Sequence, residues 1–350
     1  MINVLQCVRA GDDIIVGGGR YQEPGQSAAI RFVFSVLNLK TRQHHLIPLD
    51  FLPHGLSLNP NCLTQLVVCE KIGPGAAVID LESMSLVETI PTDPSRYYYG
   101  HCVHSKSGDV FYTTETYRDS LKGVIVIRDA QSKQVIGEFP SYGASPHECY
   151  LVDDGNTMVV TNGGGNSSGD KPNVSYIDID SQQLLRQEHL TNRHTNAGHL
   201  MHANDGSLIV VSAPRAGLGA DKLGGVSIKP QGKLMRSVSS PKKVVNKMKG
   251  EALSVAIHQY IAMVTHPTGN MLTCWSTKDR RLLKKIDLPI PRGVTLTCDK
   301  RYFVVSYGPQ ASVVKIDTQN LELLPMTASH ATYLTGSHLY NWSKMTADLC

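Results

Sequence analysis

Short apolar stretches separated by polar turns recur along the whole chain. From residue 100 to 140, and again from 146 to 190, the order is the same: an apolar stretch, a Gly-containing turn, a β-branched stretch, a loop, an alternating stretch that ends in Asp, and a last stretch. Stretches bounded by Gly, Asn and Asp clusters are typical of strands, and an apolar period of 3.6 residues nowhere persists. The pattern therefore predicts an all-β chain made of four-stranded units.

The spacing of these units predicts how their sheets are arranged. Units begin at residues spaced between 38 (292 to 330) and 52 (147 to 199) positions apart, namely His54, His101, His147, His199, Glu251, Arg292 and His330. Six units are complete, and residues 1–50 and 328–345 hold strands that can share a seventh. Closing a ring in this way removes exposed sheet edges. We expect a seven-bladed β-propeller over residues 1–350, with either residues 2–8 or residues 329–334 supplying the innermost strand of the shared blade.

Composition narrows the class of protein. Hydrophobic residues make up 41% of the chain and charged residues 18%, which suits a large core. A net charge of +4 is too mild for a dedicated nucleic-acid binder. With no long apolar run and no secretory signal at the start, we expect no membrane span and a cytoplasmic location. The eight cysteines form no C-x-x-C pair, which predicts reduced thiols rather than a zinc finger or a disulfide scaffold.

The repeats predict which side chains surround the central channel. The first strand of each blade lines the channel, and the start of that strand lies beside the end of the antiparallel second strand. The unit starts given above therefore form one ring, in which five blades contribute a histidine. A second ring is predicted from the strand-two ends, which include Glu70, Glu115, Asn162, His266 and Tyr307. Glu148 joins the site if its strand is locally bulged.

Imidazoles from separate strands indicate a metal site. Crowded histidines lower one another's pKa, and neutral imidazoles are metal ligands. We predict that the metal ligands are His54, His101, His147 and His199. Iron is favoured, with copper, nickel or zinc as alternatives. The predicted catalytic carboxylates are Glu115, which orients a histidine or acts as a general base, and Glu148. We predict that a small-molecule ligand at the channel mouth contacts Glu70, Asn162, Glu251, His266, Arg292, Tyr307 and His330. The structural alternative is that each histidine only bonds neighbouring strands.

Two further patterns are less specific. Residues 229–250 carry seven basic and no acidic residues. This segment is either a solvated connection between blades or a binding surface for an anionic partner or substrate. The glycine runs at 17–19 and 163–165 do not open a helix, so neither is a nucleotide site.

One long stretch is similar to a known family. Residues 97–164, with YYYGHCVHSKSGDVFYTTETY, GVIVIRDA, IGEFPSYGASPHECY and VVTNGG, resemble the bacterial domain-of-unknown-function family 1513. The resemblance implies a seven-bladed propeller in the style of YVTN and lactonase-like propellers. Its members are often exported and lie near iron-uptake genes, which implies iron handling. The family's motif positions fall on His101, Glu115, His147, Glu148 and residues 162–164. This chain departs by its missing export signal and by Thr116 in place of the family's Asn.

These observations leave three functions open. The first is a metal-binding propeller. If it is an enzyme, an open coordination position on the metal activates water or dioxygen for reaction with a small molecule. The second is a non-catalytic propeller whose rim loops bind a protein partner. The third is a lactonase-like hydrolase that uses a divalent cation such as calcium. In the first case we expect Arg292, Tyr307 and the segment from Lys229 to Lys249 to receive an acidic group of the substrate.

Overall fold

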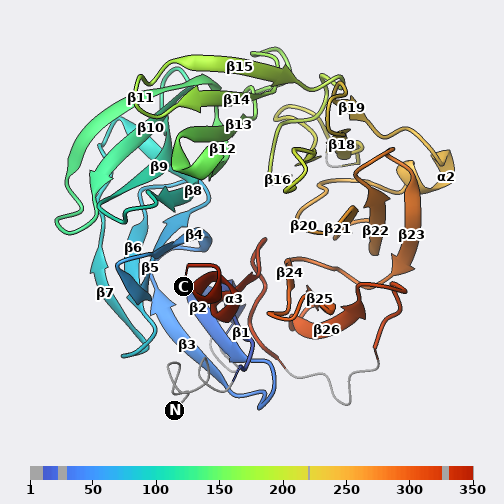
Figure 1. Cartoon of the computed structure of the whole chain (residues 1–350), viewed down its shortest axis with the longest axis horizontal. Helices are drawn as coiled ribbons and strands as arrows, with labels where there is room; N and C mark the ends of the chain where they lie inside the picture. The colour runs from blue at the N-terminus through green and yellow to red at the C-terminus, as the bar shows by residue number, and fades with distance from the viewer. Residues whose placement is uncertain (1–10, 23–29, 220, 325–330, 350) are drawn as a thin grey trace.

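Seven sheets stand around a central axis in the computed structural model, which describes residues 11–22, 30–219, 221–324 and 331–349. Six sheets have four strands and one has three, and Figure 1 shows them as a ring. The predicted all-β, seven-bladed β-propeller is thereby confirmed. No helix in the described parts is long and apolar enough to cross a membrane.

The sheets follow one another along the chain, each with its first strand innermost. The second sheet contains β4 (Pro53–Asn59), β5 (Cys62–Glu70), β6 (Ala76–Asp80) and β7 (Ser85–Thr89). The third contains β8 (Arg96–His104), β9 (Val110–Tyr117), β10 (Lys122–Asp129) and β11 (Val135–Ala144). The fourth contains β12 (Pro146–Val152), β13 (Thr157–Asn162), β14 (Asn173–Asp178) and β15 (Leu184–His189). The fifth sheet contains β16 (Leu200–His202), β17 (Leu208–Ser212), β18 (Gly225–Lys229) and β19 (Arg236–Ser237). The sixth contains β20 (Val255–His258), β21 (Ile261–His266), β22 (Met271–Ser276) and β23 (Leu282–Asp287). The seventh contains β24 (Val294–Leu296), β25 (Tyr302–Tyr307) and β26 (Ser312–Asp317). The helices are η1 (Asp153–Gly155), α2 (Lys242–Val245) and α3 (Trp342–Ala347).

The ring closes with a sheet made from both termini. Its strand order is β27-β1-β2-β3, with β27 (Tyr340–Asn341) innermost, followed by β1 (Ile14–Gln22), β2 (Ile30–Asn38) and β3 (His44–Leu49). The shared blade is confirmed. Within the described residues the innermost strand is β27, and residues 331–334 form no strand; residues 2–8, 329 and 330 of the two predicted segments lie outside the described residues.

Aspartates explain the tight turns between third and fourth strands. Asp129 accepts a hydrogen bond from the backbone N–H of Gln131 (3.1 Å), and Asp178 accepts one from that of Ser181 (2.9 Å). Such aspartates mimic a backbone turn. Four residues after each of them the chain has a positive φ, 62° at Lys133 and 59° at Gln182.

Burial follows the layers of the ring. Second and third strands such as β13 and β22 are buried along their whole length, whereas the outer β7 and β15 are largely exposed. The hydrophobic core is therefore divided into clusters between neighbouring blades. The largest of these joins the closing blade to the second sheet and contains Trp342, whose indole N–H donates to the carbonyl of Leu63 (2.8 Å).

Candidate metal centre

Interruptions in the innermost ladders turn three histidines toward the axis. The ladder between β4 and β5 passes from Pro53 directly to Gly55, so His54 has no strand partner. In β8 the pairing skips residues 99–101, and in β12 it skips residues 147–148. Such bulges re-aim side chains. The bulge at residues 147–148, on which the inclusion of Glu148 depended, is present.

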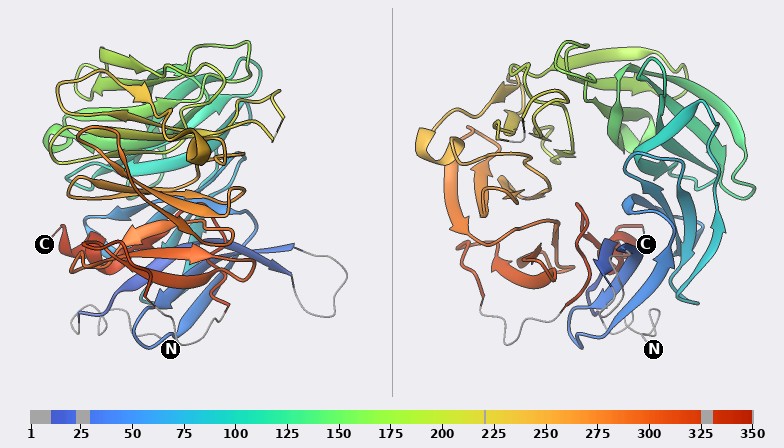
Figure 2. Two further views of the ribbon diagram at one scale, coloured as in Figure 1. Left: turned by 90° about the vertical axis from the view of Figure 1, so that its right-hand side faces the viewer. Right: turned by 180° about the vertical axis from the view of Figure 1, so that it is seen from behind.

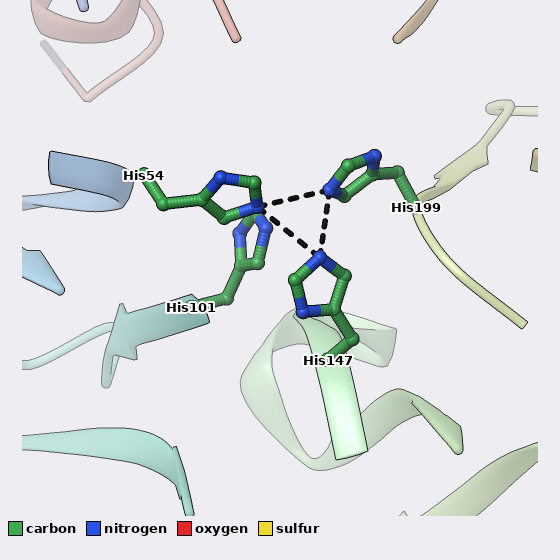
Figure 3. A group of neighbouring side chains, drawn as sticks. All are labelled: His54, His101, His147 and His199. Atoms are coloured by element: carbon green, nitrogen blue, oxygen red, sulfur yellow. Dashed lines mark hydrogen bonds between the residues drawn. The ribbon is translucent and has the colours of Figure 1, made fainter. Parts of the chain in front are cut away.

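Three imidazoles converge at the axis, as Figure 3 shows. Nε2 of His54 lies 3.1 Å from Nε2 of His147 and 3.1 Å from Nε2 of His199. The remaining pair, His147 and His199, is separated by only 2.9 Å between the same atoms. His101 completes the group, because one ligand atom from each of the four rings lies within 4.8 Å of the others. The structure thus brings together all four histidines that were predicted as ligands.

Backbone carbonyl groups determine which nitrogen carries the hydrogen in His147 and in His199. Nδ1 of His147 is 2.6 Å from the carbonyl oxygen of Tyr99, and Nδ1 of His199 is 2.6 Å from that of Leu253. A carbonyl oxygen only accepts, so both Nδ1 atoms carry the hydrogen. The Nε2 atoms of neutral His147 and His199 therefore present lone pairs to each other.

Burial keeps these rings uncharged. It is the largest cause that lowers the pKa of His54, His147 and His199 well below the usual value, and the neighbouring histidines lower the pKa of each further. Burial also lowers the pKa of His101 to about 3. Each ring of the cluster is therefore neutral and carries a single hydrogen, which in His147 and His199 lies on Nδ1 rather than on Nε2.

Glu148 is the carboxylate that contacts the cluster. Its Oε1 lies 2.7 Å from Nδ1 of His101, and burial raises the pKa of Glu148 well above its usual value. The Nε2 atom of His101 is buried and has no hydrogen-bond partner. A carboxylate on one imidazole nitrogen fixes the ring and leaves the other nitrogen as a donor for a metal.

The predicted role of Glu115 in orienting a histidine is not what the structure shows. Glu115 is fully buried in β9, where its oxygens lie 3.2 Å from Nε of Arg96 and 3.0 Å from Nη2 of Arg128. The hydroxyl groups of Thr92 and Thr113 also donate to it. This carboxylate holds its own sheet together.

A fifth histidine, His338, which was not predicted, joins the cluster. Its ring centroid is 4.0 Å from that of His199 and 4.8 Å from those of His54 and His101. With His101, Glu148 and His199 it forms a second group of candidate ligand atoms within 4.8 Å. His330 lies outside the described residues. His338 was missed because it lies in an irregular segment, and the only available signal was its position two residues before the closing strand β27.

The predicted second ring does not gather at the axis. The amide group of Asn162 bonds Ser141, and Nε2 of His266 lies 2.8 Å from the hydroxyl of Thr273 in its own sheet. A carboxylate oxygen of Glu70 accepts from the N–H of Gly75 (2.9 Å). These three side chains are local structural groups.

Of the remaining predicted contacts, Arg292 and Tyr307 are engaged elsewhere, whereas Glu251 lines a cavity that borders His147 and His199. Nε of Arg292 donates to the carbonyl of Gly336 (3.2 Å), and Tyr307 packs against the hydrophobic cluster of the last two sheets. Glu251 lies 3.8 Å from Nζ of Lys71. The basic segment 229–250 supplies β19 and the helix α2 at the outer edge of the ring, away from the axis (Figure 1).

Two cavities meet the histidine cluster from opposite faces of the ring. The larger, about 1130 Å³, is lined by His199, His338 and Glu148 and reaches the turns between first and second strands. Helix α3, near the C-terminus on one face of the disc in Figure 2, forms part of its wall. The smaller, about 170 Å³, is lined by His147 and His199 and reaches the ends of second strands. The cluster therefore separates the two cavities, and His199 borders both.

Fold and site together define a seven-bladed propeller with a buried histidine cluster on its axis. The chain belongs to the family described as "Protein of unknown function (DUF1513)", whose model matches residues 48–339. The expected resemblance is thereby confirmed.

Solved structures share the fold at low sequence identity. A Kuenenia stuttgartiensis hydrazine synthase chain has a TM-score of 0.66 and 12% identity, covering 86% of this chain and 100% of its own. The dihydro-heme d1 dehydrogenase NirN, in complex with DHE, has a TM-score of 0.60 and 13% identity, covering 96% and 69% respectively. No curated protein matches the sequence.

Proposed function

We propose that this protein binds a transition-metal ion at the axis of the propeller, through His54, His147 and His199. The observation that carries the proposal is the 2.9 Å separation between the Nε2 atoms of His147 and His199. Both rings donate through Nδ1 to carbonyl oxygens, so no hydrogen bond can join two neutral Nε2 atoms. Two lone pairs at this distance repel unless an electrophilic group lies between them: a metal ion bound to all three Nε2 atoms supplies one, and the competing donor is a hydrogen on Nε2 of His54, 3.1 Å from both.

The spacing of the nitrogens favours some metals over others. Separations of 2.9–3.1 Å correspond to angles of about 90° at a metal that lies about 2.1 Å from each nitrogen. A tetrahedral zinc site requires about 109°, and hence separations of about 3.4 Å. Angles near 90° suit octahedral or square-based iron, copper or nickel. Imidazole suits iron, copper and nickel alike; among them we favour iron, because a second group of candidate ligand atoms places the carboxylate of Glu148 beside imidazoles, the combination of donors found in non-haem iron sites.

Calcium is a poor match for the donor set. Calcium takes six to eight oxygen ligands, whereas this cluster offers imidazole nitrogens and one carboxylate, Glu148, that already bonds His101. This chemistry argues against the calcium-dependent lactonase alternative.

The larger cavity gives the proposed centre access to a small molecule. His338 and Glu148 form its inner end, and its walls include Leu56, Val255 and Leu296. Apolar walls that lead to a few polar groups are typical of small-molecule sites. A bound metal would supply Lewis-acid or redox chemistry at the inner end of this cavity. The protein's own part is to bind the substrate there, exclude bulk water and orient His101 through Glu148.

Metal content tests the proposal. Elemental analysis of the full chain without a His-tag is expected to find near-stoichiometric metal, with iron the main element. The His147→Ala, His199→Ala double variant is expected to lose it. The His258→Ala variant, which removes a partly buried histidine from the wall of the larger cavity, should keep it.

Two results would contradict metal binding: a metal-free wild-type chain after expression in metal-replete medium, or a folded double variant that retains the metal. In either case the non-catalytic propeller with a protein partner on its rim loops becomes the better account.

A further inference from the structure

The smaller cavity has its own polar lining, which the proposed metal centre does not use. Besides His147 and His199 it is lined by Arg215, Ser145 and Lys71. It opens on the face of the ring opposite the larger cavity. Its volume of about 170 Å³ has room for a few atoms or a few waters, since a water occupies about 30 Å³ of liquid.

Arg215 is a buried cation that forms no salt bridge within the described residues. Only 3% of the residue is exposed, and its Nη atoms donate to the backbone carbonyls of Arg193, Gly164 and Asp170. Its Nε atom is buried without a partner. Burial lowers the pKa of Arg215, and the carboxylate of Asp170 offsets this only in part.

The glycine run at residues 163–165 makes room for this guanidinium. A Cβ atom on Gly164 would lie 3.0 Å from Nη2 of Arg215 and 2.3 Å from the carbonyl oxygen of Asp170, and Gly164 has a φ of +78°. Any other residue at position 164 is therefore both strained and crowded. The run that resembled a phosphate loop only by composition thus acts by positioning an arginine.

A second donor at the cavity is also unused. Ser145 is 3% exposed, and its hydroxyl group is buried without a hydrogen-bond partner. Buried polar atoms are rarely left unpaired, because each costs about 1–3 kcal/mol. Lys71 adds a further positive charge, which Glu251 offsets at 3.8 Å. The lining therefore has a net positive charge and two unpaired buried polar atoms.

We propose that the smaller cavity binds a small oxyanion of a few atoms, of the size of nitrate or bicarbonate, through Arg215 and Ser145. An oxyanion supplies what the site lacks: negative charge for the guanidinium and acceptors for Nε–H and the hydroxyl group. Because His147 and His199 border the same cavity, the anion lies next to the proposed metal ligands. The anion site itself rests on Arg215 and Ser145 and does not require the metal.

Anion binding to the metal-free full-length protein tests this proposal. Sodium nitrate and sodium bicarbonate are the probes, with calorimetric titration and the thermal midpoint as readouts. Both are expected to bind and to raise the midpoint. The Arg215→Gln variant should abolish binding, and Ser145→Ala should weaken it about 10- to 100-fold through loss of one charge-assisted hydrogen bond. The matched control is Arg193→Gln, which removes an exposed arginine nearby and should bind as the wild type does.

Several outcomes would overturn the anion site. One is wild-type protein that binds neither probe, which means that the cavity holds water only. Another is a Ser145→Ala variant that binds both probes as tightly as wild type. This substitution removes no existing hydrogen bond, so the variant is expected to fold and remains informative if Arg215→Gln does not fold. The titration uses metal-free protein, so anion binding can be established even if the proposed metal site is rejected. Conversely, a protein that binds metal but neither anion rejects the anion site and leaves the metal site unaffected.

Discussion

At the scale of the residue, the position of one hydrogen atom decides what each histidine can do. The carbonyls of Tyr99 and Leu253 hold hydrogens on Nδ1 of His147 and His199, and this directs both lone pairs inward. A histidine hydrogen-bonded through Nε2, such as His266 with Thr273, has no such role. The same residue type is therefore a candidate ligand at the axis and a structural group elsewhere.

The contact between Glu148 and His101 gives a prediction at this scale. The Glu148→Gln variant keeps the shape of the side chain but replaces the carboxyl group that contacts Nδ1 of His101, and the loss of such a partner typically lowers metal affinity about 10- to 100-fold. Competition with a chelator measures the affinity. Glu70→Gln is the matched control, since Glu70 is a partly buried carboxylate that accepts a hydrogen bond from the backbone N–H of Gly75 rather than from a histidine. Equal losses in both variants would contradict a specific role for Glu148.

At the scale of the element, bulges explain which predictions succeeded and which failed. Regular alternation places the ends of second strands opposite the histidines. The bulge in β8 instead sets Glu115 opposite Tyr98, three residues before His101, so that the carboxylate joins the arginines. The bulge in β12 keeps both His147 and Glu148 at the site. A sequence predicts strands and their turns, but the size of a bulge depends on packing against the next blade.

Gly100 provides a test of the β8 bulge. Its φ is +121°, and a Cβ atom there would lie 2.6 Å from Cε1 of His147. We expect Gly100→Ala to strain the backbone and to displace His147, with a loss of metal binding of at least about 10-fold, because ligand geometry sets affinity. Chelator competition and thermal unfolding are the measurements.

The control for strain alone is Gly206→Ala, at a φ of +82° with no atom within 4 Å of the added Cβ. It should lower stability by about 1 kcal/mol and leave metal affinity unchanged. A Gly100→Ala variant that binds metal like the wild type would show that the bulge does not position His147.

At the scale of the whole molecule, the repeat pattern was sufficient to predict the ring and its shared blade, but not which strand of that blade is innermost. The number of blades and the sharing of one blade between the termini follow from the spacing of the units. The innermost strand of that blade, β27, has only two residues and follows an irregular segment, so periodicity gave no signal for it or for His338. Closure nevertheless completes the site, because it brings His338 against His199.

Buried neutral histidines predict that the metal-free molecule is sensitive to acid. Burial lowers the pKa of His101 and His266 to about 3 and that of His104 to about 4, whereas an unfolded histidine titrates near 6.5. Below pH 6.5 the unfolded chain therefore binds more protons, and stability falls with falling pH. These three residues alone contribute a slope of up to about 4 kcal/mol per pH unit between their folded and unfolded pKa values.

Denaturant unfolding of the metal-free protein at pH 7.5, 6.0 and 5.0 measures this slope. The His266→Gln variant should reduce it by about one proton. Stability that stays constant between pH 7.5 and 5.0 would mean that these histidines are not buried in their neutral form.

Anomalous X-ray diffraction at the absorption edge of the metal found by elemental analysis is the most direct measurement of the central claim. Crystals of the untagged, metal-replete protein are predicted to show one strong peak on the propeller axis, about 2.1 Å from the Nε2 atoms of His54, His147 and His199. A map with no peak among these three nitrogens, or with its only peak at the protein surface, would contradict it.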